Sequence, residues 1–203
     1  SQAFENERWS PSASQGIVDV EDFYISQSEV TVAQFVSFVD DTGAQVSAAA
    51  LTGKPDHPVT SVSWPDALAY CRWLQSVLST SSNTPAELQE LLRGGWRVTL
   101  PNEAQWEKAA RGADGRTYPW GNTPRPEAAN YNASNTRPVG NGMCDSCPYD
   151  LSDMAGNVWE LTLSRYRPYP FTETPNLDLT TDALFVMRGG SYADGAGLIR
   201  TTT

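Results

Sequence analysis

The chain has 203 residues, a formal net charge of −10 and a sequence pI near 4.5. Its length fits one domain with a sizeable core. The acidic balance argues against nucleic acid as a partner, because such a surface repels phosphate, and no apolar run is long enough to cross a membrane. The 15 glycines and 14 prolines indicate a loop-rich globular protein. The chain begins at Ser1 with neither an initiator Met nor a signal peptide, as expected of a processed or trimmed chain.

The N-terminal part predicts an arm, a strand and a helix. Residues 1–17 are polar and without periodicity, which indicates an extended arm. Apolar residues alternate over 18–25 and predict a strand. Thr31 and Gln34 then have the spacing of a capping box, and Gly43 can end the helix that begins there.

Further helices follow in the middle of the chain. Ser63 is the predicted N-cap of a second helix, with Asp66 near the positive end of the helix dipole. A short helix is predicted over 86–92, and a short strand over 96–100. Another helix begins at Asn102, and the segment after it, 115–149, is a long loop of the kind that is usually functional or tied by a metal.

The segment from Asp153 to Glu160 carries the strongest chemical signal. Its two acidic residues are too far apart for a helical i,i+4 pair. In a loop they can converge on one hard cation, with backbone carbonyls between them, and calcium accepts such ligands. The Gly-Gly pair at 189–190 follows an apolar run and indicates a bulge or tight bend. From the spacing alone, the favoured interpretation of both segments is a structural loop and a strand end.

The chain has three cysteines and one histidine. Cys144 and Cys147 form a C-x-x-C motif, which suits a local disulfide, half a zinc site or a redox pair. We favour the disulfide, because zinc needs two more ligands and His57 is the only histidine. Cys71 lies in a helical pattern and is predicted to be buried. These features suit an exported protein, periplasmic or extracellular.

Several other residues have a structural interpretation. Glu103 and Glu107 are an i,i+4 pair, which we expect to face arginines rather than to act as an acid/base couple. His57 precedes a proline and is predicted to be a hydrogen-bonded turn residue. Four tryptophans are predicted to lie in the core rather than to form substrate platforms: Trp64, Trp106, Trp120 and Trp159.

Six ordered motifs resemble the formylglycine-generating enzyme (sulfatase-modifying factor) family. They occupy residues 24–35, 57–67, 96–107, 118–122, 153–160 and 188–192. The resemblance covers roughly residues 20–200 and implies one domain over 18–203. It also implies an α+β fold that is C-type-lectin-like and loop-rich, with short strands and about three helices. Family members continue past the Gly-Gly-Ser segment to a closing strand, which the resemblance leaves missing here or supplied from elsewhere.

The resemblance also implies bound calcium. The ligands at the better-matched site would be the side chains of Asp153 and Glu160 and the carbonyls of Gly156 and Val158. A second family site is matched only at its start, by the pair Asn130 and Tyr131. The segment that follows this pair is shortened and carries the two C-x-x-C cysteines instead.

Catalysis is where the chain departs from the family. Members that make formylglycine hold copper with two cysteines, and those positions here are Asp194 and Ile199. Copper(I) prefers thiolates, so no copper is expected. Ser191 matches the family's active-site serine, and Leu198 replaces a frequent tyrosine. These positions are therefore interpreted as vestigial.

The departures favour a non-catalytic, calcium-stabilised binding or scaffolding module, an accessory subunit or exported protein that holds a protein partner. Two alternatives stay open. One is an oxidoreductase of the same fold, for formylglycine generation or a related metal-dependent oxidation, although His57 alone cannot build a facial triad. The other is a ligand-binding variable protein with a lectin fold, although the small residues of 193–197 make a poor aromatic paratope.

Overall fold

The computed structural model describes residues 19–141, 144, 146–166 and 183–203, so the predicted arm lies outside the described residues. This part holds four α-helices where about three were expected: α1 (Val32–Thr42), α2 (Trp64–Thr80), α3 (Ala86–Arg93) and α4 (Glu103–Arg111). It also holds two 3-10 turns, η2 (Ala48–Leu51) and η3 (Pro148–Asp150), and two strands, β1 (Glu160–Arg165) and β2 (Phe185–Arg188). The loop-rich α+β class is confirmed.

The helices begin where the capping signals predict. Capping boxes close α1, α2 and α4, and their N-caps are Thr31, Ser63 and Asn102. Each cap side chain accepts a bond from a backbone N–H that the helix itself cannot satisfy. Gly43 ends α1 in the left-handed conformation with φ +68°.

Both predicted strands are wrong. The described residues of 18–25 form no strand, and Phe23 and Ile25 instead pack against the α4 core. Residues 96–100 form no strand either. The N–H of Trp96 donates to the Leu91 carbonyl, and that of Val98 donates to the side chain of Gln75. No strand among the described residues pairs with either segment, and in 96–100 other groups accept the backbone hydrogen bonds.

The sheet has two strands and forms elsewhere. β1 pairs antiparallel with β2, with Glu160 opposite Arg188 and Leu161 opposite Met187. The Gly-Gly pair follows β2 directly, and Gly189 and Gly190 have φ of +94° and +73°. The sheet therefore joins the end of the 153–160 loop to the start of the 189–192 segment.

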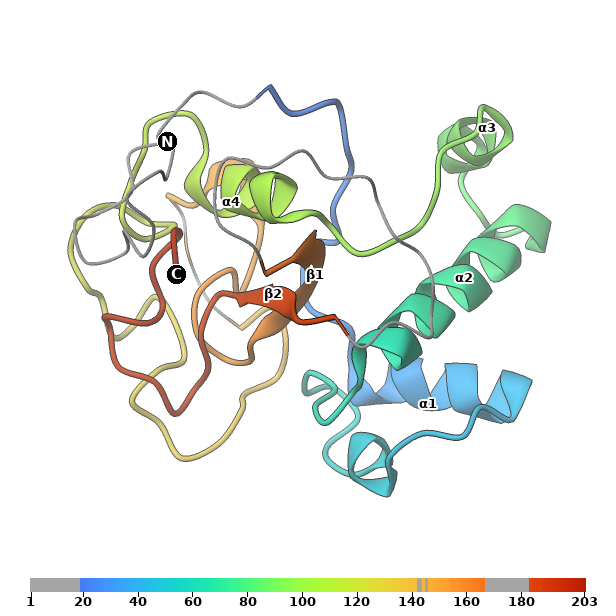
Figure 1. Ribbon diagram of the computed structural model, residues 1–203, viewed down its shortest axis with the longest axis horizontal. Helices are drawn as coiled ribbons and strands as arrows, with labels where there is room; N and C mark the ends of the chain where they lie inside the picture. The colour runs from blue at the N-terminus through green and yellow to red at the C-terminus, as the bar shows by residue number, and fades with distance from the viewer. Residues whose placement is uncertain (1–18, 142–143, 145, 167–182) are drawn as a thin grey trace.

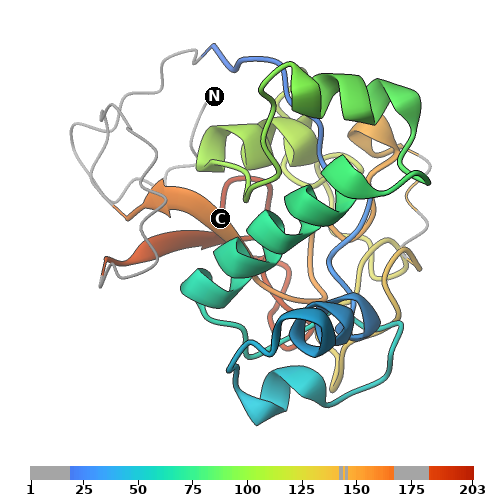
Figure 2. The same cartoon turned by 90° about the vertical axis from the view of Figure 1, so that its right-hand side faces the viewer.

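Three apolar clusters form the core of the described part. One lies between α1 and α2, which run side by side at one end of the molecule (Figures 1 and 2). The second lies under α4, and the third among the loops at the opposite end, around Trp120 and Ile199. Across the described ranges, every helix falls short of the length and apolar character that a bilayer span requires.

Candidate functional site

The 153–160 loop has an unusual backbone. Asp153, Gly156 and Asn157 all have positive φ, at 59°, 78° and 59°. A Cβ on Gly156 would lie 2.3 Å from the carbonyl oxygen of Asn130, so only glycine fits there. Left-handed non-glycine residues gather at ligand and active sites, because their strain persists only where surrounding contacts enforce it. This loop is therefore the leading candidate site.

Asp153 is held in place by two donors. Its carboxylate accepts from the guanidinium of Arg137 at 3.1 Å and from the backbone N–H of Gly140 at 2.7 Å. The Asp153 side chain has no exposed surface. Arg137 is thus the cationic partner of this acid, and it comes from the loop after residue 130.

Glu160 opens β1 and lies against α4. Its Oε2 accepts from the indole N–H of Trp106 at 2.9 Å. Burial, and to a smaller degree the charge of Asp153, raise the pKa of Glu160 to about 7, although the Trp106 bond works in the opposite direction. The charge of Asp153 therefore acts on Glu160, which places the two predicted acids in one electrostatic environment.

Glu29 is a third carboxylate beside Asp153 and Glu160, and its role was not predicted from the sequence. Its Oε2 accepts from Asn157 at 2.9 Å, while its Oε1 is buried with no hydrogen-bond partner. Burial raises the pKa of Glu29 to about 9, and the charges of Glu160 and Asp153 add to that effect. Glu29 lies three residues before the start of α1, within one of the family motifs, but 124 positions separate it from Asp153 (153 − 29).

The site gathers negative charge and oxygen donors. Three carboxylates are electrostatically coupled here, and Arg137 compensates only part of their charge. Within the described residues no hydrogen bond ends on the carbonyl oxygens of Gly156 or Val158, which leaves both free to act as ligands. The same residues contain no ready-made cluster of three acidic, histidine or cysteine ligands. Carbonyls would have to complete the shell, as they often do for calcium.

Asn157 holds the site together. It is fully buried, and its Oδ1 accepts from the side chain of Asn130 and from the backbone N–H of Arg137 at 3.1 and 3.0 Å. Its Nδ2 donates to Glu29, and its backbone carbonyl accepts from Tyr192. Asn157 thus joins the 153–160 loop to Glu29, to the 130–137 loop and to Tyr192. The sequence motif predicted that this loop is important, but it predicted no role for Asn157.

The second predicted calcium pair, Asn130 and Tyr131, lies beside the first. Asn130 lies in a bridge with Gly156, and its side-chain amide donates to Asn135 and Asn157. Tyr131 packs against the apolar cluster around Trp120. The structure therefore brings this pair to the rim of the 153–160 loop, where Asn130 supports the first site.

The vestigial positions have well-defined contacts. The carboxylate of Asp194 accepts from the hydroxyl of Ser191 at 2.6 Å and from its backbone N–H at 2.8 Å. Ile199 has no exposed surface and packs with Tyr118 and Trp120. Leu198 is 47% exposed. Of the two positions matched to the copper ligands of the family, Asp194 is a hydrogen-bond acceptor in a turn and Ile199 is a core residue.

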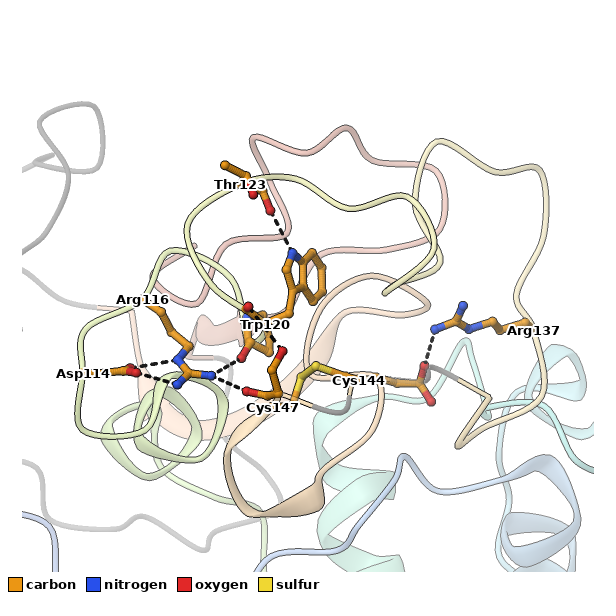
Figure 3. The surroundings of a disulfide bond; sticks show 10 residues. Asp114, Arg116, Trp120, Thr123, Arg137, Cys144 and Cys147 are labelled. Carbon is orange, nitrogen blue, oxygen red and sulfur yellow. Dashed lines mark hydrogen bonds and ion pairs between the residues drawn. A yellow bond between two sulfur atoms is a disulfide. The ribbon is translucent and has the colours of Figure 1, made fainter.

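Cys144 and Cys147 are joined in a disulfide, with Cα atoms 5.3 Å apart (Figure 3). Both residues are half-buried and pack against the Trp120 cluster. Beside them the guanidinium of Arg116 donates to the carbonyls of Pro119 and Ser146. Arg137 lies on the other side of the disulfide in the same view.

The structural interpretations of single residues are confirmed for most of them. Glu107 pairs with Arg111 at 2.8 Å and with Arg188 at 3.3 Å, and Arg188 also reaches Glu103 at 3.6 Å. The ring of His57 bonds to Thr136 at 2.8 Å. The buried or half-buried side chains are Cys71, Trp64, Trp106, Trp120 and Trp159, of which Trp159 is half-buried. Burial raises the pKa of the Cys71 thiol to about 11.

The fold and the loop geometry identify the class of domain to which the chain belongs. A short sheet, peripheral helices and long loops tied at a Gly-Gly-Ser segment are those of a C-type-lectin-like domain with the formylglycine-generating-enzyme fold. Solved structures with this fold include Treponema denticola variable protein 1, at a TM-score of 0.60 and 22% identity, covering 86% of this chain and 75% of that one. At this identity the likeness shows the fold alone.

The chain belongs to the sulfatase-modifying factor enzyme 1-like domain family, whose model matches residues 2–203. It is 35% identical over 162 residues to the formylglycine-generating enzyme of Streptomyces coelicolor, covering 70% of this chain and 44% of the relative. It is 33% identical over 157 residues to the inactive C-alpha-formylglycine-generating enzyme 2 of Bos taurus, covering 70% and 41%. It is 30% identical over 233 aligned residues to the hercynine oxygenase of Mycolicibacterium smegmatis, covering 91% and 49%. The chain spans less than half the length of these relatives.

Proposed function

We propose that this domain is a non-catalytic, calcium-stabilised binding or scaffolding module of its family. The observation that carries the proposal is the environment of Ile199, which is buried among aromatic rings at a position where copper-dependent members would place a thiolate. An aliphatic side chain can donate no electron pair to a metal. The residues present therefore do not fit copper.

The second former ligand position supports the same conclusion. Asp194 has a hard oxygen donor, and both donors of Ser191 point at it. Copper(I) binds soft thiolates in preference to such oxygens. The family also contains relatives named as inactive, so loss of the reaction on this scaffold has precedent.

Calcium is the cation that suits the Glu29, Asp153 and Glu160 site. Asp153 is buried and the two glutamates are half-buried, Arg137 is the cation bonded to this group, and the carbonyls of Gly156 and Val158 accept no hydrogen bond within the described residues. A divalent ion would offset the burial and the repulsion that raise the pKa of Glu29 and Glu160, and it would join the segment before α1, the 153–160 loop and the start of β1. The ion's role in this proposal is structural, as a tie between segments far apart in the chain.

A non-catalytic module functions by binding another molecule. We propose a protein partner, because the chain is acidic and its family scaffold presents long tethered loops. An accessory subunit or an exported protein fits this role. The disulfide suits an oxidising compartment such as the periplasm or the extracellular space.

Metal analysis and oxygen consumption test the non-catalytic role. Purified protein is assayed for calcium and copper, and oxygen uptake is followed with a cysteine-containing sulfatase peptide. We expect calcium without copper and no peptide-dependent uptake. The double variant Asp194→Cys/Ile199→Cys, loaded with copper, is the matched control that shows whether the assay detects a restored ligand pair. Peptide-dependent oxygen uptake by the unmodified protein would overturn the proposal and favour an oxidoreductase.

Calcium has its own test. Melting temperature is measured in calcium and in EGTA for the unmodified protein, for Glu160→Gln, and for Glu87→Gln. Glu87 lies exposed on α3, far from the site in the chain, and serves as the charge-matched control. The calcium-dependent rise in melting temperature should be lost in the first variant only, since a ligand stabilises the state that binds it. An unchanged rise in Glu160→Gln removes this residue from the site.

A further inference from the structure

The Cys144–Cys147 disulfide closes a ring of only four residues. A ring this short restrains little of the unfolded chain, so it adds less to stability than a long-range bridge does. Both cysteines are half-buried, so neither residue is enclosed in the core of the fold. The bridge is therefore poorly suited to be a staple of the whole fold, and its local surroundings suggest another role.

The ring is clamped to the loop that faces it. The carbonyl of Ser146, inside the ring, accepts from the guanidinium of Arg116, and the Ser146 hydroxyl donates to the carbonyl of Trp120 at 3.4 Å. Arg116 also bonds Asp114, and its own carbonyl accepts from the hydroxyl of Thr201 at 2.8 Å. Closing the ring presents the Ser146 carbonyl to a fixed donor (Figure 3).

The chain that leaves the ring is strained. Tyr149, Asp150 and Asp153 have φ of 60°, 53° and 59°, so three non-glycine residues within five positions are left-handed. Such conformations persist only where the flanking structure enforces them. One end of the segment is fixed by the disulfide and the Arg116 clamp. The other end is fixed where Asp153 meets Arg137 and Gly140.

A third contact lies in the middle of the segment. The side chain of Gln27 donates to the carbonyl of Asp150 at 3.1 Å, and the N–H of Ser152 donates to the carbonyl of Gln27 at 2.8 Å. Gln27 is two residues from Glu29, the buried acid of the candidate site. The ring, the strained segment and the acid cluster therefore form one continuous set of contacts.

We propose that the Cys144–Cys147 bond is a reversible redox clasp that sets the position of Asp153 and thereby the calcium affinity of the site. This inference rests on the calcium site proposed above. A dithiol reductant opens the clasp: one reductant thiolate attacks a cysteine sulfur, the S–S bond breaks, and the second thiol resolves the mixed disulfide. Two electrons and two protons pass to the cysteines, and the reductant leaves as its own cyclic disulfide.

Opening the clasp removes the covalent constraint on one end of the strained segment. Tyr149 and Asp150 can then relax toward right-handed conformations, which shifts Asp153 relative to Glu29 and Glu160. Calcium affinity depends on how well the ligands are positioned. Reduction should therefore raise the calcium Kd several-fold while the helices at the other end stay folded.

Calcium titration by calorimetry tests the proposal on three forms of the chain: oxidised, reduced by dithiothreitol, and Cys144→Ser/Cys147→Ser. All carry Cys71→Ala, so that no other thiol responds. We expect the reduced protein and the double serine variant to bind calcium with the same, several-fold weaker Kd than the oxidised protein. Equal Kd values for the oxidised and reduced forms would overturn the clasp.

Amide hydrogen exchange separates this inference from the calcium proposal. In EGTA, exchange across residues 151–156 should quicken on reduction, and exchange in α1 should not change. Quickened exchange in a protein that binds no calcium in either form would support the mechanical clasp and sink the calcium site. Unchanged exchange with calcium bound equally in both forms would sink the clasp and leave the calcium site standing.

Discussion

Removing the side chain of Asn157 should destabilise the protein more than any other single change in the 153–160 loop except at Gly156. The residue is fully buried, and its amide is hydrogen-bonded to Glu29, Asn130 and the backbone of Arg137 at 2.9 to 3.1 Å. Asn157→Ala deletes all of these bonds and puts no polar atom in their place.

The magnitude follows from what is left behind. The N–H of Arg137 and Oε2 of Glu29 each lose a buried partner, at about 1–3 kcal/mol apiece. Alanine also tolerates the left-handed φ of 59° less well than asparagine does, which costs roughly 1 kcal/mol more. The free energy of unfolding should therefore fall by about 3–7 kcal/mol, which is among the largest effects of single substitutions.

Urea unfolding monitored by tryptophan fluorescence measures this loss, with two controls. Asn157→Gly removes the same hydrogen bonds without the left-handed penalty, so it should be slightly more stable than Asn157→Ala. Asn132→Ala places alanine at an exposed left-handed position, φ 49°, and should lose only about 1 kcal/mol. A loss at Asn157 no larger than that at Asn132 would refute the reasoning, because the buried hydrogen bonds would then contribute nothing.

Three further predictions follow from the same loops. Gly156→Ala should prevent stable folding, since its Cβ would lie 2.3 Å from a backbone oxygen, whereas Gly43→Ala, with open space around it, should lose about 1 kcal/mol in the same urea assay. Stability of the calcium-free protein should fall as pH rises from about 4.5 to about 9: the unfolded state releases protons near the ordinary value of 4.5, while the folded state keeps them up to about 7 at Glu160 and about 9 at Glu29. Glu29→Gln should flatten the upper part of that slope in EGTA, and a slope of opposite sign would contradict the assigned pKa directions. Ile199→Ala should cost about 2–5 kcal/mol by leaving a cavity among aromatic rings, and a calorimetric melt showing no loss would mean that the ring cluster closes over it.

Local features were predicted well from the sequence, and contacts between distant segments were not. The capping boxes at Thr31, Ser63 and Asn102 depend on side chains three residues apart, so each helix start could be located without the fold. The strands over 18–25 and 96–100 were wrong because an alternating pattern marks a half-buried extended segment whether or not a neighbour pairs with it. β1 was missed for the complementary reason, because its partner β2 begins twenty residues after it ends (185 − 165).

The candidate site shows the same division. Asp153 and Glu160 lie in one short motif, and family resemblance was enough to connect them. One carboxylate oxygen of Glu29 has no hydrogen-bond partner, whereas both polar atoms of the Asn157 side chain are hydrogen-bonded. No pattern in the neighbouring sequence predicts either environment. Their roles follow from where α1 begins relative to the loop, which only the three-dimensional arrangement reveals.

Ile199 also bears on the evolutionary history of the domain. Its side chain lies against Gly190, where even a Cβ would approach it to 2.7 Å, and it fills the space beneath the ring cluster. A cysteine at this position would leave a cavity without completing a thiolate pair, because Asp194 would still be an oxygen donor. A single substitution toward the copper ligand pair of the family would therefore lower stability and supply only half of the pair, so packing as well as sequence separates this domain from copper-binding members.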